Sequence, residues 1–264
     1  RSVPGKLAEY AADWGELGVK AWARGWWEKP IDVGNEIAPL INADPGEIVM
    51  MPNVTIAQSA VVSAIDFSGP RDTIVMTDLD FPSGEVGGYL LIAVGMTSLS
   101  LITRALAARF GARIVNVGSD DGISIDQDRL IDAIDERTRL VAISHVLFKS
   151  AFINDANAIC EHAHRMGALV SLDAFHSVGI IPVDVKKSGV DFLTGGVLKW
   201  LCGGPGGGFL YVSPQIRDTL APALTGWQAH PRPFAFEEQM EYTTGAFRWL
   251  NGTPVIPALY AAAE

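Results

Sequence analysis

The sequence is poor in cysteine, poor in charge and without a long uninterrupted apolar run. Its 264 residues include two cysteines, Cys160 and Cys202, too few for a disulfide framework or a zinc site. The longest apolar stretch, residues 89–102, is broken by glycine, serine and threonine and is shorter than the ~20 residues of a membrane-spanning helix. No basic segment followed by an apolar one, as in a secretion signal, opens the chain. We therefore expect a cytoplasmic protein that does not enter membranes.

Positive charge is also scarce, because 20 Lys and Arg stand against 30 Asp and Glu, for a formal net charge of −10. This balance disfavours nucleic acid and anionic membranes as partners. An anionic ligand would have to be held by local groups such as backbone amides. Apolar residues, in contrast, make up 48% of the chain, which is enough for one large core.

Short apolar runs alternate with helical patterns along most of the chain. Runs typical of strands cover residues 48–51, 71–77, 111–117, 139–144, 168–172, 190–193 and 209–212, and helical patterns cover residues 6–27, 56–65, 101–110, 126–136 and 154–166. Near-continuously apolar strands separated by helices predict an α/β fold, with a mainly parallel sheet covered by helices on both faces. In such folds ligands bind beyond the carboxyl ends of the strands.

A carboxylate and an amine follow two of these predicted strands. Asp173 ends the strand at 168–172, His176 stands three residues later, and Lys199 follows the next strand, just before a cluster of glycines. Burial disfavours the ammonium form, so a lysine in apolar surroundings can lose its proton and attack a carbonyl. Pyridoxal 5'-phosphate needs such a pair, because the lysine binds its aldehyde while the aspartate keeps its pyridine nitrogen protonated. The sequence therefore predicts a pyridoxal phosphate site.

Each of these residues also has an ordinary interpretation. Asp173 taken alone could be a turn residue, and Lys199 a solvated side chain. His176 could make a core hydrogen bond or orient Asp173. It is the combination that indicates a cofactor. We expect no metal site, because His162 and His164 stand two residues apart on one helical pattern and so fall on different faces.

A helix start suited to a phosphate follows the strand at 48–51. Asn53 or Thr55 would cap this helix and leave N–H groups at its positive end. A phosphate can bind there without a special motif. Ordinary capping would give the same residues, so the pattern alone leaves both interpretations open.

The motifs together resemble the class V aminotransferase group of fold-type I pyridoxal phosphate enzymes, and within it the kynureninases. Asp173-Ala-Phe-His176, followed by Lys199 ahead of a Gly-Pro-Gly-Gly segment, is similar to that family's pattern. The similarity extends to Asp13-Trp14-Gly15 and to residues 37–47. It implies the large domain of fold type I, with a mainly parallel seven-stranded sheet flanked by helices, over residues 36–264. Residues 1–35 would form an N-terminal helical segment.

The resemblance also assigns roles to individual residues. It places Val54 and Thr55 at the cofactor phosphate, Phe81 on the face of the pyridine ring, and Ser144 and His176 beside the cofactor. The two remaining assignments, Trp227 and Asn251, would reach the phosphate of the neighbouring subunit's cofactor, which implies a homodimer with shared active sites. The alternative for Trp227 is a buried anchor. His145 is expected to be a loop histidine or a substrate contact.

Three features depart from the kynureninase pattern. Gly84 stands where an aspartate is expected, Leu198 stands where a tyrosine hydroxyl would contact the phosphate, and residues 84–100 look like an insertion. Family members also continue into a small C-terminal domain with an arginine for the substrate carboxylate. We expect that domain to be missing here through truncation.

These observations predict an enzyme that binds an amino acid as an aldimine and stabilises a quinonoid, with Lys199 and Asp173 as catalytic residues and His176 beside them. A kynureninase-like hydrolase or lyase is the first expectation. A class V aminotransferase or a cysteine desulfurase-like carbon–sulfur lyase is the alternative, and a non-catalytic scaffold of the same fold is the third.

Overall fold

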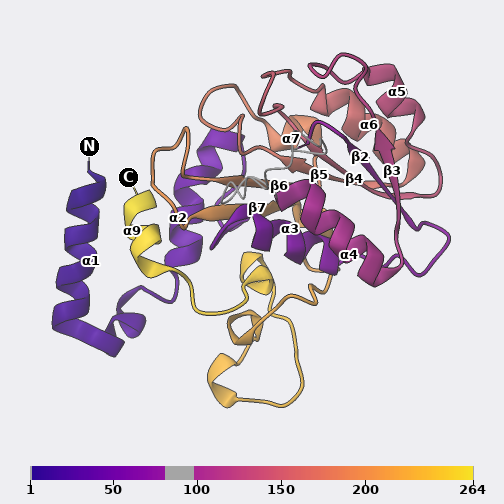
Figure 1. Ribbon diagram of the computed structural model, residues 1–264. Helices are drawn as coiled ribbons and strands as arrows, with labels where there is room; N and C mark the ends of the chain where they lie inside the picture. The colour runs from indigo at the N-terminus through magenta and orange to yellow at the C-terminus, as the bar shows by residue number, and fades with distance from the viewer. Residues whose placement is uncertain (1, 81–97, 264) are drawn as a thin grey trace, which may run out of the picture.

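The computed structural model describes residues 2–80 and 98–263. Across these residues the chain folds around one sheet with helices on both faces, as Figure 1 shows. Its strands are β1 (Ile48–Met51), β2 (Thr73–Thr77), β3 (Arg113–Val117), β4 (Thr138–Ser144), β5 (Leu169–Asp173), β6 (Phe192–Gly196) and β7 (Gly208–Val212). The predicted seven-stranded sheet is confirmed.

The sheet has the strand order β1-β7-β6-β5-β4-β2-β3. Strand β7 pairs antiparallel with both of its neighbours, β1 and β6, whereas the other pairs are parallel. The predicted mainly parallel arrangement is therefore confirmed, and the carboxyl ends of β2, β4, β5 and β6 meet at one edge. In the register, Ser144 lies opposite Asp173, and Asp173 lies opposite Thr194.

The helices cover the sheet from both sides (Figure 1). The α-helices are α1 (Val3–Leu17), α2 (Lys29–Ile37), α3 (Val54–Ser63), α4 (Thr103–Phe110), α5 (Gln127–Asp132), α6 (Ala156–Met166), α7 (Val185–Ser188), α8 (Pro214–Arg217) and α9 (Ile256–Ala262). Shorter helical turns are η1 (Gly18–Arg24), η2 (Ala38–Ile41), η3 (Ser98–Ile102), η4 (Trp227–Ala229), η5 (Pro233–Ala235) and η6 (Ala246–Trp249). None of the described helices is long and apolar enough to span a membrane.

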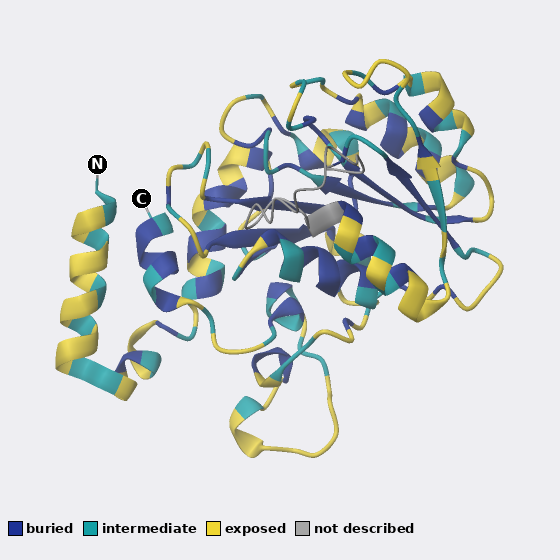
Figure 2. Cartoon of the chain, in the orientation of Figure 1, coloured by how far each residue is buried: buried dark blue, intermediate teal, exposed yellow. Residues whose placement is uncertain are grey.

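Two apolar cores lie on the two faces of the sheet. Successive side chains of a strand point to opposite faces, and β1 accordingly sends Ile48 and Met50 to one core and Val49 and Met51 to the other. The first core packs against α2, α6 and α9, and the second against α3 and η6. Figure 2 shows most sheet strands as deeply buried, with the edge strand β3 as the exception. Burial on both faces explains why these strands are continuous apolar runs in the sequence.

The predicted helix at residues 6–27 is shorter in the structure. Helix α1 ends at Leu17, because Gly18 adopts a positive φ of 52°, a conformation that side-chain-bearing residues avoid. The chain continues as the 3-10 helix η1. No residue of α1 is buried in this chain, and its outer face is exposed in Figure 2. Whether residues 1–35 form a unit separate from residues 36–264 stays a prediction.

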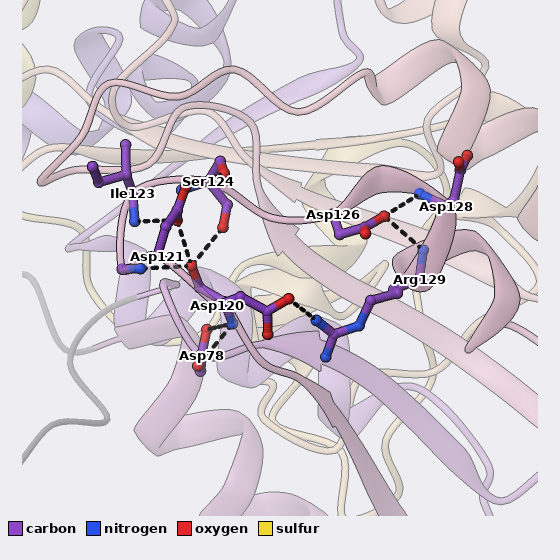
Figure 3. Close-up of polar contacts among 10 residues, drawn as sticks. Asp78, Asp120, Asp121, Ile123, Ser124, Asp126, Asp128 and Arg129 are labelled. Carbon is purple, nitrogen blue, oxygen red and sulfur yellow. Dashed lines mark hydrogen bonds and ion pairs between the residues drawn. The ribbon is translucent and has the colours of Figure 1, made fainter.

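The loop between β3 and α5 is held by carboxylates that accept backbone hydrogen bonds, as Figure 3 shows. Asp121 accepts from the N–H groups of Ile123 at 2.7 Å and Ser124 at 2.8 Å. Asp78 accepts from the N–H of Ser119 at 3.0 Å. These bonds hold the pKa of Asp121 well below its usual range. The carboxylates thus close a turn at the surface.

Candidate active site

Lys199, His176 and Asp173 come together at the carboxyl edge of the sheet. Asp173 is the last residue of β5, His176 lies in the turn that follows, and Lys199 lies in the turn after β6. The Nζ atom of Lys199 is 2.6 Å from Nε2 of His176. Lys199 and Asp173 also interact electrostatically, each favouring the charged form of the other. The neighbouring strands β5 and β6 thus bring these groups together across 26 positions of sequence.

Asp173 carries a carboxylate that the protein largely shields from water. Burial raises its pKa to about 6, while a hydrogen bond from the N–H of Phe175, 2.9 Å long, and the charge of Lys199 oppose the shift. Because the acid is desolvated, its anionic form gains from any cation that enters the site. A protonated pyridine nitrogen is such a cation.

The Lys199 and His176 side chains form a hydrogen-bonded pair. Burial lowers the pKa of Lys199, and the nearby Asp173 opposes this shift. Burial and the charge of Lys199 lower the pKa of His176 to about 4. The imidazole is therefore neutral at pH 7 and can accept a hydrogen bond from the Lys199 amine through Nε2. An amine that loses its proton easily, next to a neutral acceptor, suits a nucleophile.

The ring of Phe175 packs against the amine of Lys199. Its ring centroid lies 4.6 Å from Nζ of Lys199, in cation–π range. At Gly196, the last residue of β6, a Cβ atom would lie only 2.4 Å from the Phe175 ring. A side chain at residue 196 would therefore displace the ring on which the lysine rests.

Asp80 is a second buried carboxylate at this edge, and it was not among the predicted site residues. It follows β2 and is 4% exposed. Its carboxylate accepts hydrogen bonds from the backbone N–H groups of Thr77 and Ser144, at 2.8 and 2.7 Å. Burial raises its pKa to about 6. The available signal was an acidic residue immediately after an apolar strand.

Val54 and Thr55 begin α3, as the phosphate prediction requires. Asn53 is the cap, since its Oδ1 accepts from the N–H of Ile56 at 3.0 Å. Gly208, at the start of β7, touches this helix start closely: a Cβ at residue 208 would lie 2.7 Å from the carbonyl carbon of Asn53 and 3.0 Å from the nitrogen of Val54. The glycine allows the first turn of α3 to sit directly against the sheet.

Helix α3 is also tied to the strands that carry the polar groups. Gln58, which is fully buried, donates through Nε2 to the hydroxyl of Thr194 on β6 at 2.6 Å. Its Oε1 accepts from the hydroxyl of Ser171 on β5 at 3.2 Å. This bridge fixes the helix start relative to Asp173.

Trp227 and Asn251 lie in segments that touch each other. A Cβ at Gly226 would lie 1.9 Å from the Asn251 carbonyl oxygen, so these backbones are in direct contact. Trp227 is 39% exposed, and its ring lies 5.2 Å from that of Trp27. The buried-anchor interpretation of Trp227 is therefore wrong for this chain. Among the contacts of the described residues, none links Trp227 or Asn251 to Lys199.

The other predicted positions are placed as follows. Ser144 ends β4 opposite Asp173, and its carbonyl accepts from Nδ2 of Asn154 at 2.8 Å. Leu198, where the family pattern has a tyrosine, is 44% exposed. His145 is buried, and burial lowers its pKa. Phe81 and Gly84 lie outside the described residues, so the ring-stacking prediction for Phe81 stays a prediction.

The donor set fits pyridoxal phosphate. An amine, a desolvated carboxylate and a helix start stand at one sheet edge, which matches an aldehyde, a pyridine nitrogen and a phosphate. The close contact at Gly208 supports this fit, because it holds the start of α3 against the sheet. Lys199, Asp173, Val54 and Thr55 are the residues that would hold the group.

A separate group of possible metal donors lies in the exposed loop after η4. It consists of His230, Glu237 and Glu241. The guanidinium of Arg232 already contacts both carboxylates, at 2.7 Å from Glu237 and 3.1 Å from Glu241. The backbone N–H of Arg232 donates to Nδ1 of His230 at 3.0 Å, which puts the proton of neutral His230 on Nε2. These contacts are those of an ion-pair cluster.

Comparisons with known proteins identify the family of the chain. A model of the aminotransferase class-V family matches residues 31–264. Kynureninase from Pseudomonas fluorescens is 33% identical over 259 residues, covering 96% of this chain and 58% of that protein. The chain thus spans about three fifths of the length of that relative.

Two solved structures share the fold. The apo structure of cysteine desulfurase from Thermococcus onnurineus NA1 has a TM-score of 0.75 and 24% identity, covering 99% of this chain and 62% of that one. A mutant of C-DES with glycine covalently linked to its PLP cofactor has a TM-score of 0.83 and 22% identity, covering 99% and 66%. At these identities the likeness concerns the fold. Since the family model covers nearly the whole sequence, and the sheet and the kynureninase match agree with it, this chain belongs to the class V aminotransferase family.

Proposed function

We propose that this chain carries the cofactor-binding part of a pyridoxal phosphate-dependent enzyme that acts on an amino acid. The observation that carries the proposal is the 2.6 Å contact between Lys199 Nζ and His176 Nε2, next to the desolvated carboxylate of Asp173. When bound, pyridoxal phosphate supplies an aldehyde for an amine and a ring that accepts electrons from the substrate's α-carbon.

Lys199 is the nucleophile and later the base. Burial lowers the pKa of Lys199 and so favours the neutral amine, the form that would bind the aldehyde of pyridoxal phosphate. The same amine, when not bound to the cofactor, would be placed to take a proton from the substrate. Neutral His176 accepts the hydrogen bond of Lys199 and so orients the amine.

Asp173 and the start of α3 would hold the two ends of the cofactor. The Asp173 carboxylate would keep a proton on the pyridine nitrogen, because its desolvation makes an ion pair with a pyridinium favourable. Val54 and Thr55, in the first turn of α3, would offer backbone amides to the phosphate. Ser144 stands opposite Asp173 and borders the same site.

The first candidate reaction is that of a kynureninase-like hydrolase or lyase, supported by the 33% identity to kynureninase. An aminotransferase or a carbon–sulfur lyase is the second candidate, supported by the likeness to a cysteine desulfurase structure. The exposed Leu198 in place of a tyrosine favours keeping the second candidate. Incubation with kynurenine, alanine plus a keto acid, or cysteine, followed by product analysis, separates them. Turnover of alanine or cysteine without turnover of kynurenine would exclude the first.

A homodimer with shared active sites is part of the proposal. Trp227 and Asn251 lie in touching segments, and no contact among the described residues joins either of them to Lys199. The family resemblance, in which these two residues serve the neighbouring subunit's cofactor, supports shared sites. A monomer with full cofactor affinity would contradict it.

Covalent attachment tests the cofactor directly. Purified protein is incubated with pyridoxal phosphate, reduced with borohydride and digested, and the peptide that contains Lys199 is examined by mass spectrometry. We expect the added cofactor mass on Lys199 and a visible absorbance band before reduction. Lys199→Ala should abolish both, whereas Lys187→Ala, on the exposed helix α7, should abolish neither.

A non-catalytic scaffold would give a different result. Such a protein would be colourless with pyridoxal phosphate, and its melting temperature would not respond to the cofactor. The same pattern in the wild-type protein would remove the proposal.

A further inference from the structure

A buried carboxylate outside the three-residue site stands behind it. Asp80 is 4% exposed and accepts three hydrogen bonds: from the N–H of Thr77 at 2.8 Å, from the hydroxyl of Thr77 at 2.5 Å, and from the N–H of Ser144 at 2.7 Å. Both carboxylate oxygens are therefore engaged. The bonds join the end of β2 to the end of β4.

The sheet register brings this carboxylate close to Asp173. Ser144, whose N–H binds Asp80, lies directly opposite Asp173 on the neighbouring strand. Asp80 follows β2, which is two strands from β5 in the sheet, but its carboxylate reaches the end of β4. Strand β4 is the neighbour of β5, and adjacent strands are about 4.8 Å apart. The negative charge of Asp80 contributes to the raised pKa of Asp173.

No cation compensates Asp80 within the part of the chain that the structure describes. Its pKa is set by burial and by hydrogen bonds from Thr77 and Ser144, without a lysine or arginine. A buried anion without a partner is costly. The charge of Asp80 also disfavours the charged form of Asp173, which Lys199 favours. A cation bound between the strand ends would relieve both.

We propose that Asp80 is a positioning residue that works through Asp173 and Ser144: it fixes the ends of β2 and β4 and adds negative charge behind the carboxylate that holds the pyridinium. The inference rests on the proposed function. With both carboxylates present, the pyridine nitrogen keeps its proton to higher pH than Asp173 alone would allow. The electron-accepting form of the ring is then maintained through the neutral range.

Other ionisable groups near Asp173 also affect the charge around it. Lys199 lies on the side of β6 and favours the charged form of Asp173. His176, next to Lys199, is neutral at pH 7. His145 follows β4, and its N–H donates to the Asp173 carbonyl at 2.9 Å. Since burial lowers the pKa of His145, neither histidine replaces the charge of Asp80 near pH 7.

The test compares Asp80→Asn with a matched control at the opposite edge of the sheet. Asp191 is also a buried carboxylate, 7% exposed, and it accepts from the N–H of Val170 at 2.8 Å and from His164 at 2.9 Å. Asp191→Asn therefore removes a buried carboxylate at the other end of the strands from Asp173, although Asp191, unlike Asp80, also contacts a histidine. Each protein is loaded with pyridoxal phosphate labelled with ¹⁵N in the ring, and the ring nitrogen is followed by NMR from pH 5 to 10.

We expect Asp80→Asn to lower the pH at which the ring nitrogen loses its proton by about one unit, and to weaken cofactor binding several-fold. Asp191→Asn should leave both unchanged. If Asp80 is purely structural, Asp80→Asn will lower the melting temperature but the ring nitrogen will titrate as in wild type. This outcome would overturn the inference. Failure of the wild-type protein to bind pyridoxal phosphate would instead overturn the proposed function.

A second measurement applies if Asp80→Asn does not fold. The wild-type protein is labelled with ¹³C in its aspartate carboxyl groups and titrated with and without pyridoxal phosphate. Two carboxyl signals with raised, coupled titrations in the cofactor-free protein, both shifting to lower pH on binding, support the role of Asp80. A response of the Asp173 signal alone would overturn it.

Discussion

At the scale of single residues, the site is built from groups whose ionisation is altered by burial. Asp173 is made a stronger base by desolvation, Lys199 a weaker one, and His176 is kept neutral. In the cofactor-free protein this arrangement is unfavourable, since the loss of water around Asp173 outweighs the hydrogen bond from Phe175 and the charge of Lys199. Such groups are typical of binding and catalytic sites rather than of stable cores.

The pH dependence of stability should reveal Asp173. Its pKa rises from 3.8 in the unfolded chain to about 6 in the folded one, so between these values the folded state binds more protons and stability falls as pH rises. Replacing Asp173 by Asn removes this loss. We expect the stability of Asp173→Asn relative to wild type, both without cofactor, to increase by on the order of 2 kcal/mol from pH 4 to pH 7.

Urea unfolding at a series of pH values measures this difference. Other groups change stability with pH in the opposite direction; His176 is one, because its lowered pKa makes stability rise with pH. Taking the difference between the two proteins cancels the contributions of such groups. Parallel curves for the two proteins would show that the Asp173 carboxylate is not desolvated. Addition of pyridoxal phosphate should reverse the order at pH 7, because only wild type has the anion for a pyridinium.

At the scale of secondary structure, the site depends on close contact between α3 and the start of β7. Gly208 allows that contact, and Gln58 locks the helix to Thr194 and Ser171. The helix therefore has one fixed position relative to Asp173. A helix start that binds a phosphate needs such support, because its amides must point at a defined place.

Gly208→Ala should disturb the helix start more than the fold. The added Cβ would lie 2.7 Å from the backbone carbonyl carbon of Asn53. A backbone atom cannot move aside as the end of a flexible side chain can. We expect a loss of about 1–3 kcal/mol of stability and at least a tenfold weaker affinity for pyridoxal phosphate. Pyridoxal, which lacks the phosphate, should lose less affinity. Absorbance titration measures both ligands.

Gly69→Ala is the matched control for this substitution. Gly69 has open space around its Cβ position and no positive φ, so the change should affect neither ligand. Equal weakening of pyridoxal and pyridoxal phosphate in Gly208→Ala would argue against a phosphate at the start of α3.

At the scale of the whole molecule, the ends of the described chain pack together. Helix α1 lies beside α9 (Figure 1). Trp26 donates to the hydroxyl of Tyr260 at 3.0 Å, and Tyr260 donates to Asp13. Trp27, the residue after Trp26, forms a second aromatic cluster with Trp227 and Phe234. Phe234 is 66% exposed, so part of this aromatic surface faces outward, beside the segments proposed to serve a neighbouring subunit.

Mixing two defective chains should restore cofactor sites if the sites are shared. Lys199→Ala removes the covalent partner, and Asn251→Asp places a negative charge at the proposed phosphate contact. In a mixed dimer, one site combines an intact Lys199 with an intact Asn251. Unfolding and refolding the two chains together should therefore recover about one quarter of the wild-type high-affinity sites. Fluorescence titration with pyridoxal phosphate counts them.

The separately refolded variants supply the baseline for the mixing experiment. A mixture that binds no better than the mean of its two components would contradict shared sites. Recovery that requires refolding together, rather than simple mixing, would identify exchange of subunits as the cause.

The sequence alone was enough to predict the strands, the mainly parallel sheet, and the meeting of Asp173 and Lys199 at one edge of that sheet. It could do so because doubly buried strands must be apolar along their whole length, and because polar groups at parallel strand ends meet at one edge. The predicted bounds of β1, residues 48–51, agree with the structure. The long helix at residues 6–27 could not be bounded, since Gly18 is compatible with both a helix and its end.

Which other groups reach that edge follows from the packing of the folded chain. Asp80 belongs to the site because the register places Ser144 opposite Asp173, and a single sequence does not contain the pairing of strands. Gly208 matters because Asn53 lies against it, and Trp227 is exposed because its surroundings come from distant segments. Local propensity and apolar pattern act over a few residues, whereas these contacts join positions that only the packed chain brings together.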